Sequence, residues 1–332
     1  MVNRSGWGEK ETAPQMNVHS LLGRSALALS LVAASLPLSS IHAQQILSVA
    51  PRPTEISRSA TVSPLSYEFQ AETSYIGDGA ATHGRINYGN FSEINSSASF
   101  VLSDQIRNNF ILRLGVQWER YAFDTSSPVT PIPNSINAVN AVIGGDIQLT
   151  SALLVRVEAH PGIYGNFKHA TPRLFNVPIT IGASYFQTPD LIFIAGLSID
   201  PNSDVPVIPA VGVHWKISDR WLIDGVAPRP QLQFSLTDKI TLFAGADLRT
   251  GTYRMDNQFG HSVRLEKLNN AILDYWEVRG GGGLTWAIWN GVNLDIEGGF
   301  VPYRRFDFYR ADLKVTSSDW APYVRVGLSA SF

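Results

Sequence analysis

The segment 321–332 reads APYVRVGLSASF, and it alternates apolar residues with small or polar ones up to Phe332. Successive side chains of a strand point to opposite faces, so every second residue shares a face. The residues on its apolar face are Val324, Val326, Leu328, Ala330 and Phe332. Chain ends usually fray into polar residues unless a neighbour holds them. We therefore predict a strand that is held in a sheet to its last residue.

The composition is unlike that of an ordinary soluble domain. Charged residues make up 16% of the 332 residues, whereas typical soluble domains have roughly 25%. The net charge of −2 argues against a nucleic-acid partner, which would require a basic surface. The chain has no cysteine, which excludes disulfides and thiolate chemistry. Such a surface suits apolar surroundings better than water.

The N-terminal part has the features of an export signal. Arg24 precedes an apolar core of about residues 26–38, and Ala43 ends a small-residue cleavage site. The core is too short for the ~20 apolar residues of a membrane-spanning helix. We expect residues 1–43 to be a leader and signal peptide, and residues 44–64 to be a flexible lead-in within the periplasm.

From residue 65 onward the sequence predicts one strand after another. Residues 110–119, 153–160 and 207–216 each alternate between an apolar face and a mixed face. A soluble sandwich shows the same alternation, but its strands usually run about five or six residues, whereas a membrane-crossing strand needs ~9–11. Several runs here reach ten residues or more. Short turns also alternate with longer loops, as in barrels with periplasmic turns and extracellular loops.

The connections predict the number of strands. We expect tight turns at Ser103-Asp104, Thr150-Ser151, Thr188-Pro189-Asp190, Ser218-Asp219-Arg220, Thr237-Asp238-Lys239 and Trp289-Asn290-Gly291. We expect longer connections at residues 77–84, 124–137, 164–177, 200–206, 250–271 and 305–320. This layout gives fourteen strands, or twelve if residues 221–236, which prolines interrupt, form one bent strand.

The last tight turn also predicts a register. Residues opposite each other in an antiparallel pair share a face, and Gly291 suits the left-handed position of a three-residue turn. Thr285 should then lie opposite Asp295, and Glu277 opposite Tyr303, on the inner face.

The terminal segment resembles the C-terminal assembly signal of Gram-negative outer-membrane β-barrel proteins, with matches at Val324, Val326, Leu328, Ala330 and Phe332. The resemblance covers the leader and about residues 65–332, and the chain is most similar to uncharacterised families of this class. It implies an all-β fold, a transmembrane antiparallel up-and-down β-barrel of 12–14 strands with both termini in the periplasm. It also implies the bacterial outer membrane as location, with the lipid bilayer, lipopolysaccharide and the barrel-insertion machinery as partners. A closed barrel satisfies every backbone donor and acceptor within lipid.

The inward positions of the predicted strands form the candidate site. They carry charges of both signs and are Arg113, Gln117, Glu119, Arg156, Glu158, His160, His214, Lys216, Asp247, Arg249, Glu277, Arg279, Asp295, Glu297 and Arg325. Twelve to fourteen strands lie between barrels that side chains fill and barrels with open channels. The sequence favours a narrow porin-like conduit for small solutes. A structural or surface-interaction barrel with a filled lumen is the alternative.

Aromatic residues lie near the predicted strand ends, where outer-membrane barrels carry lipid-facing girdles. They are Trp118, Tyr121, Trp215, Trp221, Trp276, Trp286, Trp289, Tyr303, Trp320 and Tyr323. An enzyme is not expected, although a lipid-modifying enzyme stays a second alternative. The resemblance implies that such an enzyme would carry a Ser–His pair on its outer wall, whereas His160 and His214 are predicted to face inward. No cofactor or metal site is expected.

Overall fold

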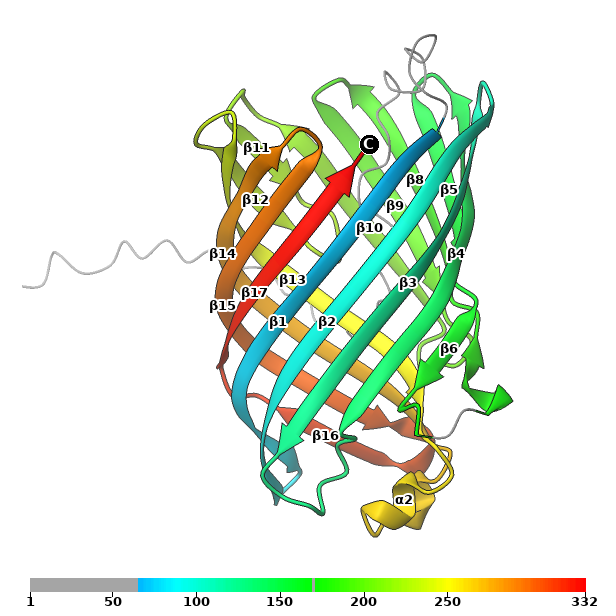
Figure 1. Cartoon of the computed structure of the whole chain (residues 1–332), viewed down its shortest axis with the longest axis vertical. Helices are drawn as coiled ribbons and strands as arrows, with labels where there is room; N and C mark the ends of the chain where they lie inside the picture. Colours follow the sequence, from blue (N-terminus) through cyan, green and yellow to red (C-terminus); the bar gives the residue numbers. More distant parts are fainter. Residues whose placement is uncertain (1–64, 169–170) are drawn as a thin grey trace, which may run out of the picture. The chain divides into compact units, whose positions relative to one another are not determined.

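The computed structural model describes residues 65–168 and 171–332, so the predicted signal peptide and lead-in lie outside the described residues. Its strands form one antiparallel sheet that closes on itself (Figure 1). The closure joins β17 (Ala321–Ser331) to β1 (Leu65–His83) in a continuous register between Glu68–Ser331 and Ile76–Tyr323. No helix in the described part of the chain is long and apolar enough to cross a membrane.

Seventeen strand segments make up a barrel of fourteen strands. Three barrel strands consist of two segments each, namely β5 with β6, β7 with β8, and β16 with β17. Besides β1 and β17, the segments are β2 (Ile86–Arg107), β3 (Phe110–Thr125), β4 (Ser135–Thr150), β5 (Leu153–Ala159), β6 (Gly162–Gly165), β7 (Phe175–Asn176), β8 (Ile179–Thr188), β9 (Leu191–Ile199), β10 (Val207–Lys216), β11 (Trp221–Asp224), β12 (Gln231–Ser235), β13 (Ile240–Arg254), β14 (Ile272–Trp289), β15 (Val292–Phe308) and β16 (Leu313–Ser317).

The two ends of the barrel differ in their connections. One end, here the turn end, holds the short turns at residues 108–109, 151–152, 189–190, 217–220, 236–239 and 290–291. The opposite end, here the loop end, holds the helices η1 (Pro172–Leu174), α2 (Phe259–Ser262), η2 (Glu266–Leu268) and η3 (Tyr309–Ala311). Figure 1 shows α2 at the end opposite the C-terminus. Which end faces the periplasm stays a prediction.

The prediction of fourteen strands is confirmed, since β11 and β12 form a short hairpin instead of one bent strand. Two predicted connections are wrong. β2 continues through Ser103 and Asp104 to Arg107, because the alternation on its inner face persists there. β1 continues to His83 and so occupies nearly all of the connection predicted at residues 77–84. A β-bulge between Ile76 and Gly79 interrupts the alternation by which this part of the strand could have been predicted.

Several predicted loops are also shorter than expected. β13 extends to Arg254 and β15 extends to Phe308, so strand occupies the first residues of the loops predicted at 250–271 and 305–320. β16 lies within the second of these segments. The barrel wall is therefore longer at the loop end than the sequence predicted.

The register of β14 and β15 is partly as predicted. Thr285 lies opposite Asp295, and Gly291 has a φ of 77°, in the left-handed region that glycine adopts readily. Toward the loop end, β15 contains a β-bulge at Pro302, opposite Arg279.

The bulge at Pro302 changes which residues of β15 face inward. Proline cannot donate a ladder hydrogen bond, so within a strand it is tolerated at a bulge. Beyond it, Glu277 pairs with Arg304 instead of the predicted Tyr303. The bulge adds one residue to β15, and a one-residue slip exchanges the two faces of a strand. It brings three residues to the inner face: Arg304, Phe306 and Phe308.

The outer face of the wall is apolar. Exposed residues on it include Val116, Phe193, Val211, Trp286 and Val324, from five different strands. An even number of antiparallel strands, an apolar exterior and short turns at one end together define a transmembrane β-barrel of the outer-membrane type. The strands therefore present these side chains to hydrocarbon.

Candidate functional site

Side chains fill the barrel interior near the loop end. Buried aromatic rings converge there, and the ring centroid of Phe306 lies 5.0 Å from those of Phe123 and Tyr275. Phe259 of α2 stacks on Phe308, with ring centroids 6.0 Å apart, so the helix contributes to the same cluster. We call this cluster the loop-end core. It closes the straight path through this end of the barrel.

A layer of buried charges lies between the loop-end core and the turn half. The hydroxyl of Tyr275, a residue of the core, lies within hydrogen-bond distance of both Glu93, at 2.7 Å, and Glu277, at 2.9 Å. Arg279 donates to Glu277, and Arg279 and Arg304 each lie 3.8 Å from Glu93. All four charged side chains are at most 1% exposed. Two guanidinium groups thus face two carboxyl groups in this layer.

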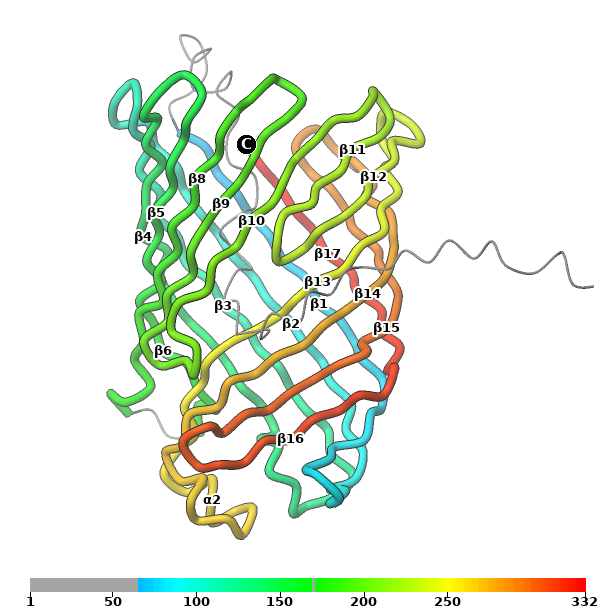
Figure 2. The backbone as a smooth tube through the Cα atoms, turned by 180° about the vertical axis from the view of Figure 1, so that it is seen from behind, coloured from blue at the N-terminus to red at the C-terminus, as the bar shows by residue number. Residues whose placement is uncertain are grey.

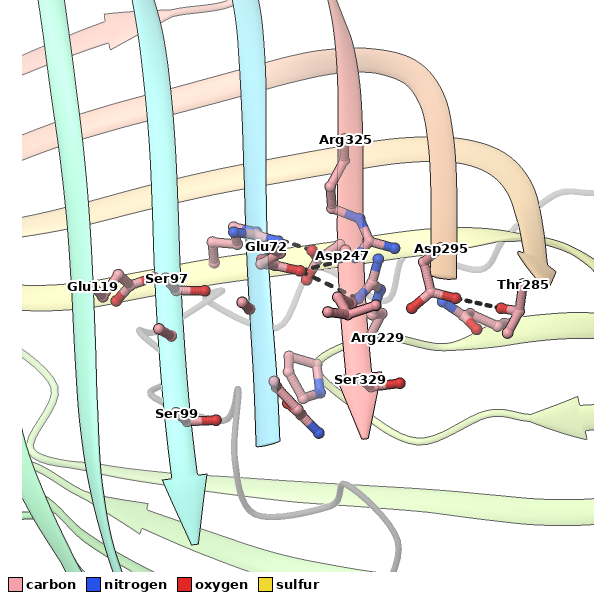
Figure 3. A pocket seen from close by; sticks show the side chains of 18 of the residues that line it. Glu72, Ser97, Ser99, Glu119, Arg229, Asp247, Thr285, Asp295, Arg325 and Ser329 are labelled. Carbon is pink, nitrogen blue, oxygen red and sulfur yellow. Dashed lines mark hydrogen bonds and ion pairs between the residues drawn. The ribbon is translucent and has the colours of Figure 1, made fainter. Parts of the chain in front are cut away.

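A polar cavity of about 380 Å³ occupies the turn half of the interior. We call it the chamber. Figure 3 shows Glu72 with Arg229 and Arg325 converging in it. Glu72 accepts from Arg325 at 2.8 Å and from Arg249, and it lies 4.0 Å from Arg229. Glu297 accepts from Arg325 at 2.6 Å and from Arg229 at 2.5 Å. Arg249 of β13 and Arg229 of the β11–β12 connection thus reach strands that are not their neighbours in the wall.

Acidic groups are in excess around the chamber. Three arginines line it, and each has carboxylate partners. The carboxylates that line it are Glu72, Glu119, Asp224, Asp247 and Asp295. Asp295 accepts a hydrogen bond from Thr285 at 2.5 Å, and Glu119 accepts one from Tyr121 at 2.7 Å. A cavity lined by an excess of one sign concentrates ions of the opposite sign, so the chamber favours cations over anions.

A second cavity of about 70 Å³ adjoins the chamber. Gln117 and Glu119 line both cavities. The second cavity extends from these residues to His160 and to Thr250 of β13.

The strand register places the predicted lumen residues on the inner face, in separate groups. Gln117, Glu119, Asp247, Arg249, Asp295 and Arg325 line the chamber, and Glu297 binds two of its arginines. Glu277 and Arg279 belong to the buried charge layer. The remaining residues lie elsewhere along the inner face, as Arg113, Arg156, Glu158, His160, His214 and Lys216.

The remaining residues make local pairs. Arg113 donates to Glu158 at 2.7 Å, and Arg156 donates to Asp146 at 2.6 Å. Lys216 lies 3.0 Å from Asp219 at the turn end and is half exposed. The first two pairs compensate charges on the wall of β3, β4 and β5, and none of these residues lines the chamber.

Sequence reasoning missed several residues of the site. Glu72 lies on β1 and Glu93 on β2, where Thr73 and Ser92 interrupt the apolar alternation beside them. Pro302 is the signal that could have identified Arg304, because a proline inside a strand indicates a bulge. No local pattern marks Arg229, which enters the chamber from the connection between β11 and β12.

The predicted aromatic girdle needs correction at three positions. Tyr121 and Tyr323 are buried inside the barrel, and the Tyr323 hydroxyl donates to Glu297. Trp276 is 3% exposed, because the guanidinium of Arg305 covers its ring at 4.7 Å. These three residues do not contact lipid. The predicted girdle tryptophans that are exposed are Trp118, Trp215, Trp221, Trp286, Trp289 and Trp320, and their role at the lipid interface stays a prediction.

Both histidines considered for hydrolysis lie on the inner face. His160 Nε2 is 3.9 Å from Glu158 Oε2, and His214 Nδ1 is 3.7 Å from Asp224 Oδ1. Neither can therefore form the outer-wall Ser–His pair of a lipid hydrolase. The geometry of these two residues does not support an enzyme.

Comparison with known proteins gives structural neighbours alone. No protein-family model matches the chain, and no curated protein matches it. The toluene transporter TodX of Pseudomonas putida is 10% identical, with 88% of this chain and 94% of TodX covered and a TM-score of 0.44. The NanC porin is 13% identical, with 79% and 98% covered and a TM-score of 0.36. The KdgM porin is 10% identical, with 80% and 99% covered and a TM-score of 0.31.

Similarities this weak do not identify what this chain binds. The closed sheet, the apolar exterior and the sorted connections stand on the geometry of the chain itself. The architecture is that of an outer-membrane β-barrel.

Proposed function

We propose that this protein is a narrow outer-membrane conduit for small polar solutes, closed at the loop end in the conformation described. The observation that supports this most is the chamber of about 380 Å³ in the turn half, which is lined mainly by polar side chains. In a purely structural barrel, such a cavity would not add to stability, because larger interior side chains could fill it as they fill the loop end.

Passage requires a second conformation or a route around the loop-end core. The core rings and the paired charges beneath them leave no straight path in this conformation. Low, intermittent permeability is the expected behaviour of such a conduit. The excess of carboxylates in the chamber makes anions the least favoured solutes.

The test is solute uptake by liposomes that contain the purified full chain, together with conductance in planar bilayers. We expect low uptake by the wild type, and higher uptake after Phe306→Ala and Phe123→Ala open the loop-end core. Phe193→Ala on the outer face serves as a matched control and should leave uptake unchanged. Heat-modifiable migration on gels checks that each variant still forms a barrel. Absence of uptake by both the wild type and the opened variant would overturn the proposal.

A structural or surface-interaction barrel is the second candidate. The loop-end core favours it, because a filled interior stabilises the wall and supports the connections that carry α2 and η3. Shortening residues 255–271 would then alter binding or envelope integrity without altering uptake of solutes. The same deletion in a conduit would increase uptake.

A further inference from the structure

β13 changes its neighbour along one edge, and the second cavity lies beside this change. On that edge, the Leu248 N–H donates to the carbonyl of Pro228, in the connection between β11 and β12, at 3.0 Å. The next strand contact is made by Arg254, which pairs with Gly165 of β6. Figure 2 shows the β11–β12 hairpin ending partway along β13. Thr250, which lines the cavity, lies between these two contacts.

Three polar side chains from three strands line this cavity, and each has a buried oxygen atom without a hydrogen-bond partner among the described residues. They are Asn140 of β4, Thr180 of β8 and Thr250 of β13, which are 7%, 2% and 5% exposed. Among the described residues, the Asn140 Oδ1, Thr180 Oγ1 and Thr250 Oγ1 atoms have no hydrogen-bond partner. Burying one such group without a partner is unfavourable, so three around one cavity indicate an occupant that forms hydrogen bonds.

The rest of the lining restricts the charge and shape of the occupant. Tyr164, Tyr253, Ala138 and Pro178 provide apolar surface, which suits the carbon skeleton of an organic solute. The carboxylate of Glu119 lies at the entrance shared with the chamber, and no lysine or arginine is among the described residues that line the cavity. An anion would meet a carboxylate with no fixed cation to compensate it. Hydroxyl groups, which both donate and accept, match the two threonines and the asparagine.

We propose that the second cavity is a binding site for a small uncharged polyol. Hydroxyl groups of the solute bond to Asn140, Thr180 and Thr250, and its carbon atoms pack against Tyr164 and Tyr253. Gln117 and Glu119 line both the cavity and the chamber, so the binding site adjoins the proposed conduit. The site deepens the proposed conduit by naming its solute class, and its role in transport rests on that proposed function.

The test measures binding, without transport, to the purified full chain in a detergent that has no sugar headgroup. Saturation-transfer NMR with erythritol as the probe should detect binding to the wild type. Thr180→Val and Thr250→Val keep side-chain shape and remove the hydroxyl groups, and together they should weaken binding about tenfold. Thr241→Val is the matched control, because Thr241 lies opposite Thr285 on the inner face and lines neither cavity. The control should bind as the wild type does.

Two further measurements make the inference specific. Ala138→Leu fills the cavity without removing a polar group, and it should abolish erythritol binding. Glycerate, a carboxylate of similar size, should bind at least tenfold more weakly than erythritol. Heat-modifiable migration again confirms that the variants fold.

Equal erythritol binding by the wild type and the double valine variant would overturn the proposal. So would the absence of binding by the wild type, which would mean that the cavity holds water alone. Binding without liposome uptake would contradict the proposed conduit and leave the site standing. Uptake without binding would contradict the site and leave the conduit standing.

Discussion

The two halves of the barrel interior have the same wall and opposite contents. The loop half is packed with rings such as Phe123, Tyr275 and Phe306, each at most 5% exposed. The turn half keeps a chamber of about 380 Å³ between charged side chains of several strands. The number of strands is the same around both halves, so it does not decide whether a lumen is open. The size and polarity of the inward side chains decide it.

The charge layer between the halves explains how one interior can hold both. Glu277 and Arg279 are fully buried on the core side, whereas Glu72 and Arg229 reach the chamber. Along the interior, packed aromatic rings come first, buried ion pairs follow, and the polar chamber comes last. The predictions below test this gradient.

Breaking the charge layer should have the largest effect. Arg279→Leu removes the arginine partner of Glu277 and the hydrogen bond to Ser74 Oγ at 2.9 Å. Removing one member of a buried pair costs about 3–5 kcal/mol, so the free energy of unfolding should fall by that amount. Urea unfolding in lipid vesicles, followed by tryptophan fluorescence, measures the loss. Arg220→Leu in an exposed turn is the control and should change little. A loss below about 1 kcal/mol for Arg279→Leu would contradict a sealed charge layer.

Removing one ring from each half compares them directly. Phe306→Ala leaves a cavity among packed rings, and it should lower the free energy of unfolding by about 3–5 kcal/mol. Phe243 lines the chamber, so in Phe243→Ala solvent can fill the space that the ring leaves. The loss in free energy of unfolding should therefore be about 2 kcal/mol smaller than for Phe306→Ala. The same unfolding measurement applies to both variants. Equal losses would mean that the two halves are packed alike.

The outer wall beside the chamber should behave as lipid-facing surface. Val326 is 44% exposed on β17, on the face opposite Arg325. Val326→Arg should lower the free energy of unfolding in vesicles by about 2–4 kcal/mol if the residue lies near the bilayer midplane. Val326→Ile is the matched control and should be nearly neutral. A neutral arginine variant would place this part of the wall outside the hydrocarbon.

A single charge in the chamber should have the smallest effect on stability. Asp295→Asn keeps an acceptor for Thr285 and stays next to the cavity, so the free energy of unfolding should change by less than about 1 kcal/mol. The preference for cations over anions should fall, because the chamber loses one negative charge. Reversal potentials across planar bilayers under a salt gradient measure that preference. A large loss of stability would mean that Asp295 belongs to the packed half.

Much of the wall could be predicted from the chain by local rules. The two-residue alternation identifies strands, and the turn at Gly291 correctly pairs Thr285 with Asp295. The same rules fail where an extra residue enters a strand. The bulge at Pro302 changes which residues of the last part of β15 face inward. The bulge after Ile76 interrupts the alternation in the last part of β1. A proline within a strand is a readable signal, whereas the bulge after Ile76 has none as clear.

By itself, then, the sequence determined a wall of twelve to fourteen strands with an apolar outside and a charged inside, because alternation is a local property with a period of two. Only the tertiary structure decided that one half of the interior is filled and the other half hollow. Arg249 meets Glu72 across 177 positions of the chain, and Arg229 reaches Glu297 from a connection that folds into the lumen. Such contacts depend on the curvature of the closed sheet, which no short stretch of sequence specifies.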